Sequence, residues 1–204
     1  MSVRIAILVE GATEQAFIPK LREFLKARLP HGTMPKIDTV PCDGRVYTKE
    51  KLRRTVALLL SGKNAADAVI ALTDVYTGTR EFTNAQDAKD KMQQWVGHEP
   101  RFYPHVALHD FEAWLLPFWG DIQKLAGSNW STPGANPEQV NHDKPPAYRL
   151  QEMFRTGERG KAYVKPRDAA RILRSNDLTI AAQACPELKA FLNTILSLCG
   201  IAAL

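Results

Sequence analysis

Four acidic residues stand at, or just after, the ends of apolar segments of the sequence: Glu10, Asp74, Asp110 and Glu112. In open parallel α/β sheets, ligands bind in the crevice beyond the carboxyl ends of the strands. Carboxylates that meet there repel one another unless a cation holds them, and Mg²⁺ or Mn²⁺ prefers such oxygen ligands. A metal held in this way polarises a phosphoryl oxygen and generates a hydroxide nucleophile. The pattern therefore predicts phosphoryl transfer, with phosphodiester cleavage as the most natural reaction.

Glu10, Asp74 and Glu112 are the predicted metal ligands, with Asp110 and Glu14 in reserve. Each main ligand also has a structural alternative. Glu10 could close a strand-to-helix turn while Glu14 serves the helix N-terminus, and Asp74 could form a turn or a helix cap. Glu112 could be an exposed acid in a first helical turn. Convergence of these side chains in the fold would favour the metal site over the separate structural roles.

Strand and helix patterns alternate through the first 110 residues. The predicted strands span residues 3–9, 36–42, 68–73 and 102–108, and the predicted helices span 13–30, 49–61 and 84–95. Thr13 is the expected N-cap of the first helix, and Pro19 implies a kink or a later start. The alternation is typical of a doubly wound α/β fold with a mainly parallel sheet of about four strands.

The second half of the chain has a helical pattern. Helices are predicted over residues 111–119, 148–155, 166–174 and 186–199, with a long loop over 127–146. We therefore expect an α/β core over residues 1–120 and a helical C-terminal region over 121–204 that packs on it.

Basic residues provide a candidate phosphate-binding surface. The sequence has 27 Lys and Arg against 22 Asp and Glu, a net charge of +5 that suits an anionic partner. Five cations gather around one predicted helix: Lys161, Lys165, Arg167, Arg171 and Arg174. The last three recur at helical spacing and could follow a nucleic-acid backbone, while Lys165 could approach the scissile phosphate. A solvated helix face is the alternative.

Several other classes find no support in the sequence. Three cysteines without a CxxC pair give neither a zinc knuckle nor a disulfide framework. The chain has no GxxxxGK[ST], HExxH, GxSxG or GxGxxG motif, so a P-loop ATPase, a zinc protease and a dinucleotide enzyme are unsupported. The apolar runs are too short to span a membrane and show no signal-peptide cleavage pattern, so we expect a soluble cytoplasmic protein.

Three segments together resemble a known family. They are Val9–Glu14 (VEGATE) after the first strand, Thr73–Tyr76 (TDVY), and His109–Leu116 (HDFEAWLL). With Asn136–Asn141 (NPEQVN), they are similar to the DUF4276 group of Toprim-like proteins, distantly related to the nuclease domains of OLD-family proteins. The resemblance covers residues 3–175 and implies a Toprim/Rossmann-like α/β fold.

The same resemblance implies a function. Toprim enzymes cleave nucleic-acid strands with Mg²⁺ or Mn²⁺ and use the first Glu, here Glu10, as general acid or base. It also implies a partner ATPase of the ABC or AAA type, encoded nearby, as in anti-phage modules. The second acid of the Toprim D-x-D motif is replaced by Tyr76. A single-metal nuclease, with Asp110 or Glu112 as the substitute ligand, and a non-catalytic subunit that binds nucleotide, nucleic acid or the ATPase therefore both stay open.

Overall fold

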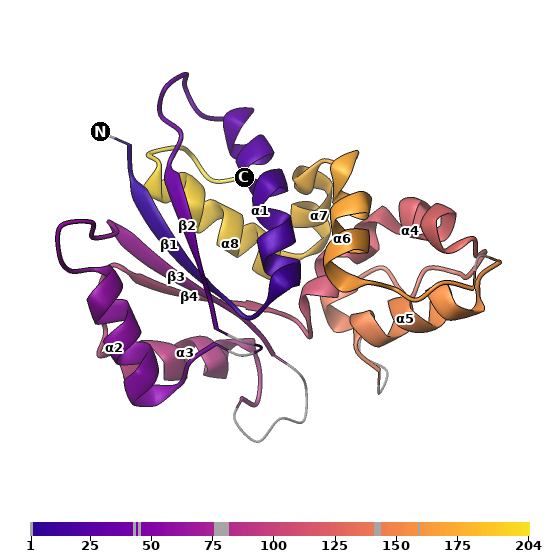
Figure 1. Cartoon of the computed structure of the whole chain (residues 1–204), viewed down its shortest axis with the longest axis horizontal. Helices are drawn as coiled ribbons and strands as arrows, with labels where there is room; N and C mark the ends of the chain where they lie inside the picture. The colour runs from indigo at the N-terminus through magenta and orange to yellow at the C-terminus, as the bar shows by residue number, and fades with distance from the viewer. Residues whose placement is uncertain (1, 43, 45, 76–81, 141–143, 159) are drawn as a thin grey trace.

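The structure, a computed structural model, describes residues 2–42, 44, 46–75, 82–140, 144–158 and 160–204. It contains one four-stranded sheet with strand order β2-β1-β3-β4, and all neighbouring strands are parallel (Figure 1). The strands are β1 (Arg4–Val9), β2 (Lys36–Pro41), β3 (Ala68–Asp74) and β4 (Phe102–Ala107). This arrangement confirms the predicted α/β class and the parallel sheet.

The two central strands are apolar along their length because both of their faces are covered. Along β1, Ile5, Ile7 and Val9 enter the core on one face of the sheet, whereas Ala6 and Leu8 enter the core on the other. The strand register aligns Val9 with Leu72 of β3 and with Pro41 of β2. The residue after β1 therefore lies beside the last residues of β3.

Helices cover both faces of the sheet. Helices α2 (Lys49–Leu59) and α3 (Ala85–Val96) pack on one face, and α1 (Ala12–Lys26) packs on the other. Gly11, and not the predicted Thr13, is the N-cap of α1. Pro19 lies inside α1 on its exposed side, and the helix ends at Lys26, four residues before Pro30.

The C-terminal half is helical, as expected. Its elements are η1 (Phe111–Phe118), α4 (Trp119–Ala126), η2 (Pro137–Gln139), α5 (Pro146–Thr156), α6 (Lys165–Arg174), α7 (Leu178–Ala184) and α8 (Pro186–Leu198). Residues of most of these elements join β1 and α1 in one continuous hydrophobic core. The buried ring of Trp114 lies at its centre, with its centroid 5.9 Å from that of Phe191 on α8 and 6.2 Å from that of Phe17 on α1.

Two sequence predictions for this half are wrong in detail. The predicted helix over 111–119 is a 3₁₀-helix that contains Pro117 and is followed by α4. Almost every side chain of this 3₁₀ segment is buried, so packing rather than a one-sided helical pattern determines its conformation. Helix α7 is also absent from the prediction, because its seven residues are too few to establish a period.

Candidate functional site: an acidic crevice

Glu10 lies at the carboxyl end of β1, where the strand register brings it to β3. Its Oε1 accepts a hydrogen bond from the backbone N–H of Asp74 at 3.0 Å and another from the hydroxyl of Thr73. Burial raises the pKa of Glu10, and the nearby Glu14 adds to that rise, while the bonds from Thr73, Asp74 and Val46 oppose it. The side chain is thus fixed at the sheet edge and binds a proton more readily than an exposed Glu.

Glu14 has a structural role in the first turn of α1. Its Oε2 accepts the backbone N–H of Gly11 at 3.0 Å, which forms the Glu half of a capping box. Glu14 is only 5% exposed. The alternative in which Glu14 serves the helix N-terminus is therefore present in the structure. Its charge still acts on the crevice, because it contributes to the raised pKa values of Glu10 and Asp74.

Asp74 ends β3 and is the electrostatic centre of the site. We call its five acids, Glu10, Glu14, Asp74, Asp110 and Glu112, the crevice acids. Burial raises its pKa well above the ordinary value, and the charges of four acids raise it further: Glu10, Glu14, Asp110 and Glu112. Such an effect falls off with distance, so the five carboxyl groups share one region of the protein. The structure therefore brings together the predicted ligands and reserves.

Asp110 and Glu112 are the most deeply buried acids of this group, at 0% and 1% exposure. Asp110 Oδ2 accepts the backbone N–H of Ala147 at 3.0 Å, whereas its buried Oδ1 has no hydrogen-bond partner among the described residues. Burial raises the pKa of Asp110 to about 6, against the bond from Ala147 and the charge of Lys165. Burial, followed by the charge of Asp110, raises the pKa of Glu112 to about 7.

Lys165 and Tyr163 bring polar hydrogens to Glu112 from the segment that begins α6. The ammonium of Lys165 lies 3.5 Å from Glu112 Oε2, and the Tyr163 hydroxyl lies 3.4 Å from Oε1. Burial alone would lower the pKa of Lys165, but the carboxylates of Glu112, Asp110 and Asp74 together raise it above the ordinary value. Lys165 therefore stays protonated beside the acids, as the sequence prediction requires of a phosphate contact.

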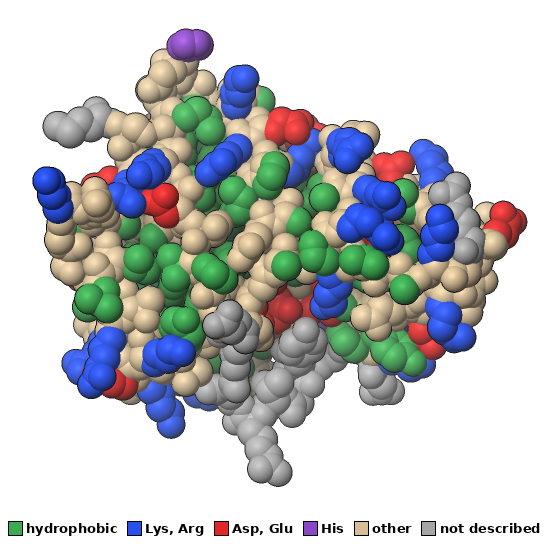
Figure 2. Space-filling view, viewed as in Figure 1, with side chains coloured by type: hydrophobic (Ala, Val, Ile, Leu, Met, Phe, Trp, Pro, Cys, Tyr) green, Lys and Arg blue, Asp and Glu red, His purple; other side chains and the backbone are tan. Residues whose placement is uncertain are grey.

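The other predicted phosphate-binding residues are arranged differently. Arg167 and Arg171 form ion pairs with the buried carboxylate of Asp168, at 2.8 and 3.3 Å. Arg174 lies at the far end of α6, where it lines a cavity of about 280 Å³ with Lys20 and Arg28. Lys161 is exposed. In Figure 2, blue side chains gather over α6, and acidic atoms are visible at the lower edge of the same face.

The donor atoms of the crevice suit a small hard cation. Every candidate ligand is a carboxylate, the pKa values of four of them are raised, and Asp110 Oδ1 is buried without a hydrogen bond in the described structure. In the described residues, no three side chains of His, Cys, Asp or Glu are positioned to hold a metal ion together. A metal would therefore require side chains such as Glu112 to turn from their present partners. Tyr76, which replaces the second acid of the Toprim D-x-D motif, lies outside the described residues.

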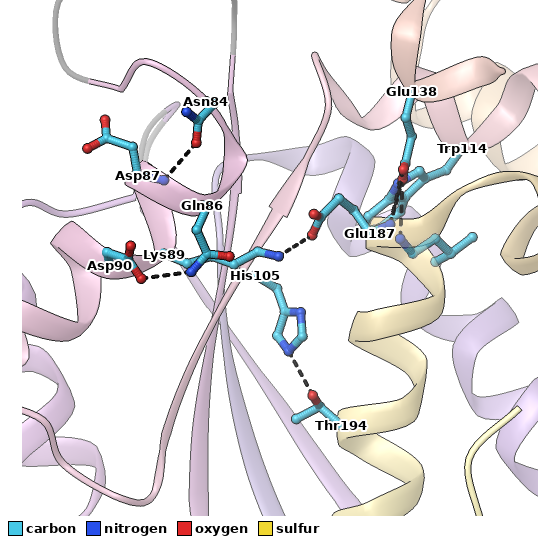
Figure 3. Close-up of polar contacts among 11 residues, drawn as sticks. Asn84, Gln86, Asp87, Lys89, Asp90, His105, Trp114, Glu138, Glu187 and Thr194 are labelled. Carbon is cyan, nitrogen blue, oxygen red and sulfur yellow. Dashed lines mark hydrogen bonds and ion pairs between the residues drawn. The ribbon is translucent and has the colours of Figure 1, made fainter.

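The sequence analysis did not identify three polar residues whose contacts stabilise the C-terminal half of the molecule. Asp168 and Tyr163 are described above, and the third, Glu138, lies in the family-like segment before α5. Its carboxylate accepts the indole N–H of Trp114 at 3.0 Å and the backbone N–H groups of Glu187 and Leu188 at the start of α8 (Figure 3). Glu138 and Tyr163 have partners 24 to 51 positions away, so no local pattern marks them. The partners of Asp168 lie within four positions, on the same helix or just before it.

The fold and the crevice define a three-layer α/β protein with an acidic site at the carboxyl edge of a parallel sheet. The chain matches the model of DUF4276, a domain of unknown function, over residues 9–196, and it belongs to that family. No curated protein and no solved structure matches it. Among the described residues, no helix is both long enough and apolar enough to cross a membrane.

Proposed function

We propose that this protein hydrolyses phosphodiester bonds of nucleic acid with Mg²⁺ or Mn²⁺ bound in the acidic crevice. The observation that supports this proposal most is that the charges of four other acids act on Asp74, with Lys165 beside them. Glu14 belongs to a capping box, and Glu10 and Asp110 each accept a backbone N–H, but these bonds do not require that the acids lie together. Burying these acids together destabilises the fold, and function is the usual reason for such a cost.

Glu10, Asp74 and Glu112 would hold the metal, with Asp110 and Glu14 as further oxygen donors. The metal would polarise the scissile phosphate and lower the pKa of a bound water. Lys165 would contact a non-bridging phosphate oxygen, since its ammonium already lies at the edge of the acidic group. To hold the metal, Glu112 would have to leave Lys165, and the ammonium would then be available to a phosphate oxygen.

Glu10 is the proposed general acid or base, the role that its resemblance to Toprim proteins implies. Its raised pKa supports that role, because a general acid or base works best near the pH of the reaction. Oε1 accepts hydrogen bonds from Thr73 and Asp74, which favours Oε2 as the oxygen that holds the proton. The cations of α6 and Lys161 would contact the flanking phosphates.

The proposed setting is cytoplasmic, with a separate ATPase of the ABC or AAA type as partner, as the family resemblance implies for anti-phage modules. The sequence has no P-loop of its own, which is consistent with ATP hydrolysis in another chain. The thiols of Cys42 and Cys185 are buried, as is usual in a reducing compartment.

The proposal can be tested with purified protein on DNA and RNA, alone and with the partner ATPase. We expect cleavage that requires Mg²⁺ or Mn²⁺ and disappears with a chelator. Glu10→Gln and Glu112→Gln should each lower the rate by at least about 100-fold. Asp90→Asn, a charge change on the exposed side of α3, is the matched control and should leave the rate unchanged.

Absence of metal-dependent cleavage in every combination would refute hydrolysis. Binding of nucleic acid, nucleotide or the ATPase without cleavage would instead establish the non-catalytic alternative.

A further inference from the structure

Two tyrosines each lie within three residues of a backbone amide that hydrogen-bonds to a residue of the acidic group. Tyr47 lies three residues after Gly44, whose backbone N–H donates to the carbonyl oxygen of Glu10 at 2.7 Å. Tyr148 follows Ala147, whose backbone N–H donates to Asp110 at 3.0 Å. Since Glu10 and Asp110 both act on Asp74, the two tyrosines flank one acidic group. Tyr47 lies just before α2 and Tyr148 lies in the first turn of α5, and in Figure 1 these two helices lie to either side of the carboxyl ends of the strands.

Each tyrosine ring has a lysine ammonium over it. Lys51 Nζ lies 3.7 Å from the centroid of the Tyr47 ring, and Lys144 Nζ lies 4.6 Å from that of Tyr148. Tyr148 is 40% exposed, and Tyr47 is partly exposed. Both pairs also have ordinary contacts in the fold, since Tyr47 packs in part on the hydrophobic core, and the Tyr148 hydroxyl and the Lys144 ammonium both contact the carboxylate of Glu152. Both rings nevertheless stay partly exposed, and both lysines are exposed.

A cavity of about 270 Å³ opens beside the first pair. Its lining consists of Cys42, Val46, Tyr47, Thr48 and Lys51. The cavity therefore combines an aromatic ring, a hydroxyl and an ammonium in the segment whose Gly44 amide hydrogen-bonds to the backbone of Glu10. An aromatic ring with a neighbouring cation is the combination that proteins use to stack a base and contact the adjoining phosphate.

We propose that single-stranded nucleic acid lies across the crevice, with one base on Tyr47 and another on Tyr148, on opposite sides of the scissile phosphate. The reason is geometric. In a duplex the base faces are stacked on their neighbours, so two protein rings that flank one phosphate can reach base faces only in an unpaired strand. Each lysine can swing from its ring to a phosphate and leave the ring to the base. This inference rests on the proposed function, of which it names the substrate.

Binding can be measured apart from cleavage, by fluorescence anisotropy with labelled oligonucleotides of about 12 nucleotides in a chelator. We expect the wild-type protein to bind the single strand more tightly than the matching duplex. Tyr47→Ala and Tyr148→Ala should each weaken single-strand binding by about 5- to 100-fold. Tyr47→Phe and Tyr148→Phe should retain it, because the ring and not the hydroxyl stacks on the base.

The control for this test is a similar pair at the other end of α1. There the guanidinium of Arg28 lies 3.9 Å from the centroid of the Phe24 ring, and Arg28→Ala should leave single-strand affinity nearly unchanged. Lys51→Ala and Lys144→Ala provide variants that keep the rings, and both should make binding less dependent on salt.

The two proposals fail in different ways. Equal affinity for single strand and duplex, or unchanged binding by both Tyr→Ala variants, would overturn the single-strand inference even if metal-dependent cleavage is found. Tyrosine-dependent binding of the single strand without cleavage would support this inference and overturn the hydrolytic function.

Discussion

The carboxylate of Asp110 accepts the backbone N–H of Ala147 at 3.0 Å, which joins the segment after β4 to the first turn of α5. The N-terminal strands supply Glu10 and Asp74, whereas Lys165 and the amide of Ala147 come from the helical half. The crevice is therefore complete only when both halves are packed. Its acids should consequently respond to mutation differently from acids elsewhere in the molecule.

Asp74→Asn should stabilise the fold while abolishing the proposed activity. The substitution keeps the shape of the side chain and removes a charge that four other acids oppose. We expect the free energy of unfolding to rise by about 1–3 kcal/mol in chelator, measured by urea denaturation near neutral pH. A loss of stability of similar size would contradict the repulsion among the acids, on which the proposed metal site depends.

Asp168→Asn provides the contrast, because the same chemical change is made at a carboxylate beside two arginines. Asp168 accepts the backbone N–H of Val164 at 2.8 Å and binds Arg167 and Arg171. Burial alone would raise its pKa, but these partners outweigh burial and lower it. The substitution should lower the free energy of unfolding by about 1–3 kcal/mol. Stability unchanged by Asp168→Asn would show that the arginines are not held by this residue.

Stability should also depend on pH through His105 of β4. Burial lowers the pKa of His105 to about 3, and its Nε2 lies 2.9 Å from the Thr194 hydroxyl on α8 (Figure 3). Below the ordinary His pKa, the unfolded chain binds a proton that the folded protein excludes, so the contribution of His105 to stability falls as the pH falls, opposite in sign to that of the acids with raised pKa values. Between about pH 7.5 and about pH 5.5 this effect amounts to roughly 1.4 kcal/mol.

The variant His105→Gln isolates that contribution. It should be less stable than the wild type near pH 7.5, but its free energy of unfolding should change less between the two pH values. Parallel pH profiles for the two proteins, measured by urea denaturation, would exclude His105 as the source of the effect.

The sequence predicts the sheet well because apolar runs fix it locally. Residues 68–73 are apolar almost throughout, and β3 spans Ala68–Asp74 with the acid at its end. The acids of the crevice can be found in the same way, since strand ends of a parallel sheet share an edge. The contact of Asp110 with the amide of Ala147, and those of Glu138 with the start of α8, are less accessible. They join residues 37 to 50 positions apart, which meet only when the helical half packs.

Gly157 is a position where the sequence gives no warning of a tight contact. A Cβ added there would lie 2.2 Å from the carbonyl oxygen of Ala126 at the end of α4, so no side chain fits without backbone movement. We expect Gly157→Ala to lower the free energy of unfolding by about 3 kcal/mol or more. Gly120→Ala is the control, because a Cβ in α4 at that position meets no atom within 4 Å. It should be neutral or slightly stabilising, and both can be compared by thermal denaturation.

Substitutions of Lys165 and Lys161 can separate two roles of the basic segment: contact with the scissile phosphate and general binding of nucleic acid. Lys165 lies 3.5 Å from Glu112, whereas Lys161 is exposed. If Lys165 contacts the scissile phosphate, Lys165→Met should reduce kcat by about 100-fold or more, because an interaction made with the reacting group is lost. Lys161→Met should leave kcat nearly unchanged and weaken nucleic-acid binding, with a salt dependence shallower by about one unit. Equal effects of the two substitutions on kcat would mean that Lys165 only neutralises Glu112 or strengthens binding, and the phosphate-contact role would have to be withdrawn.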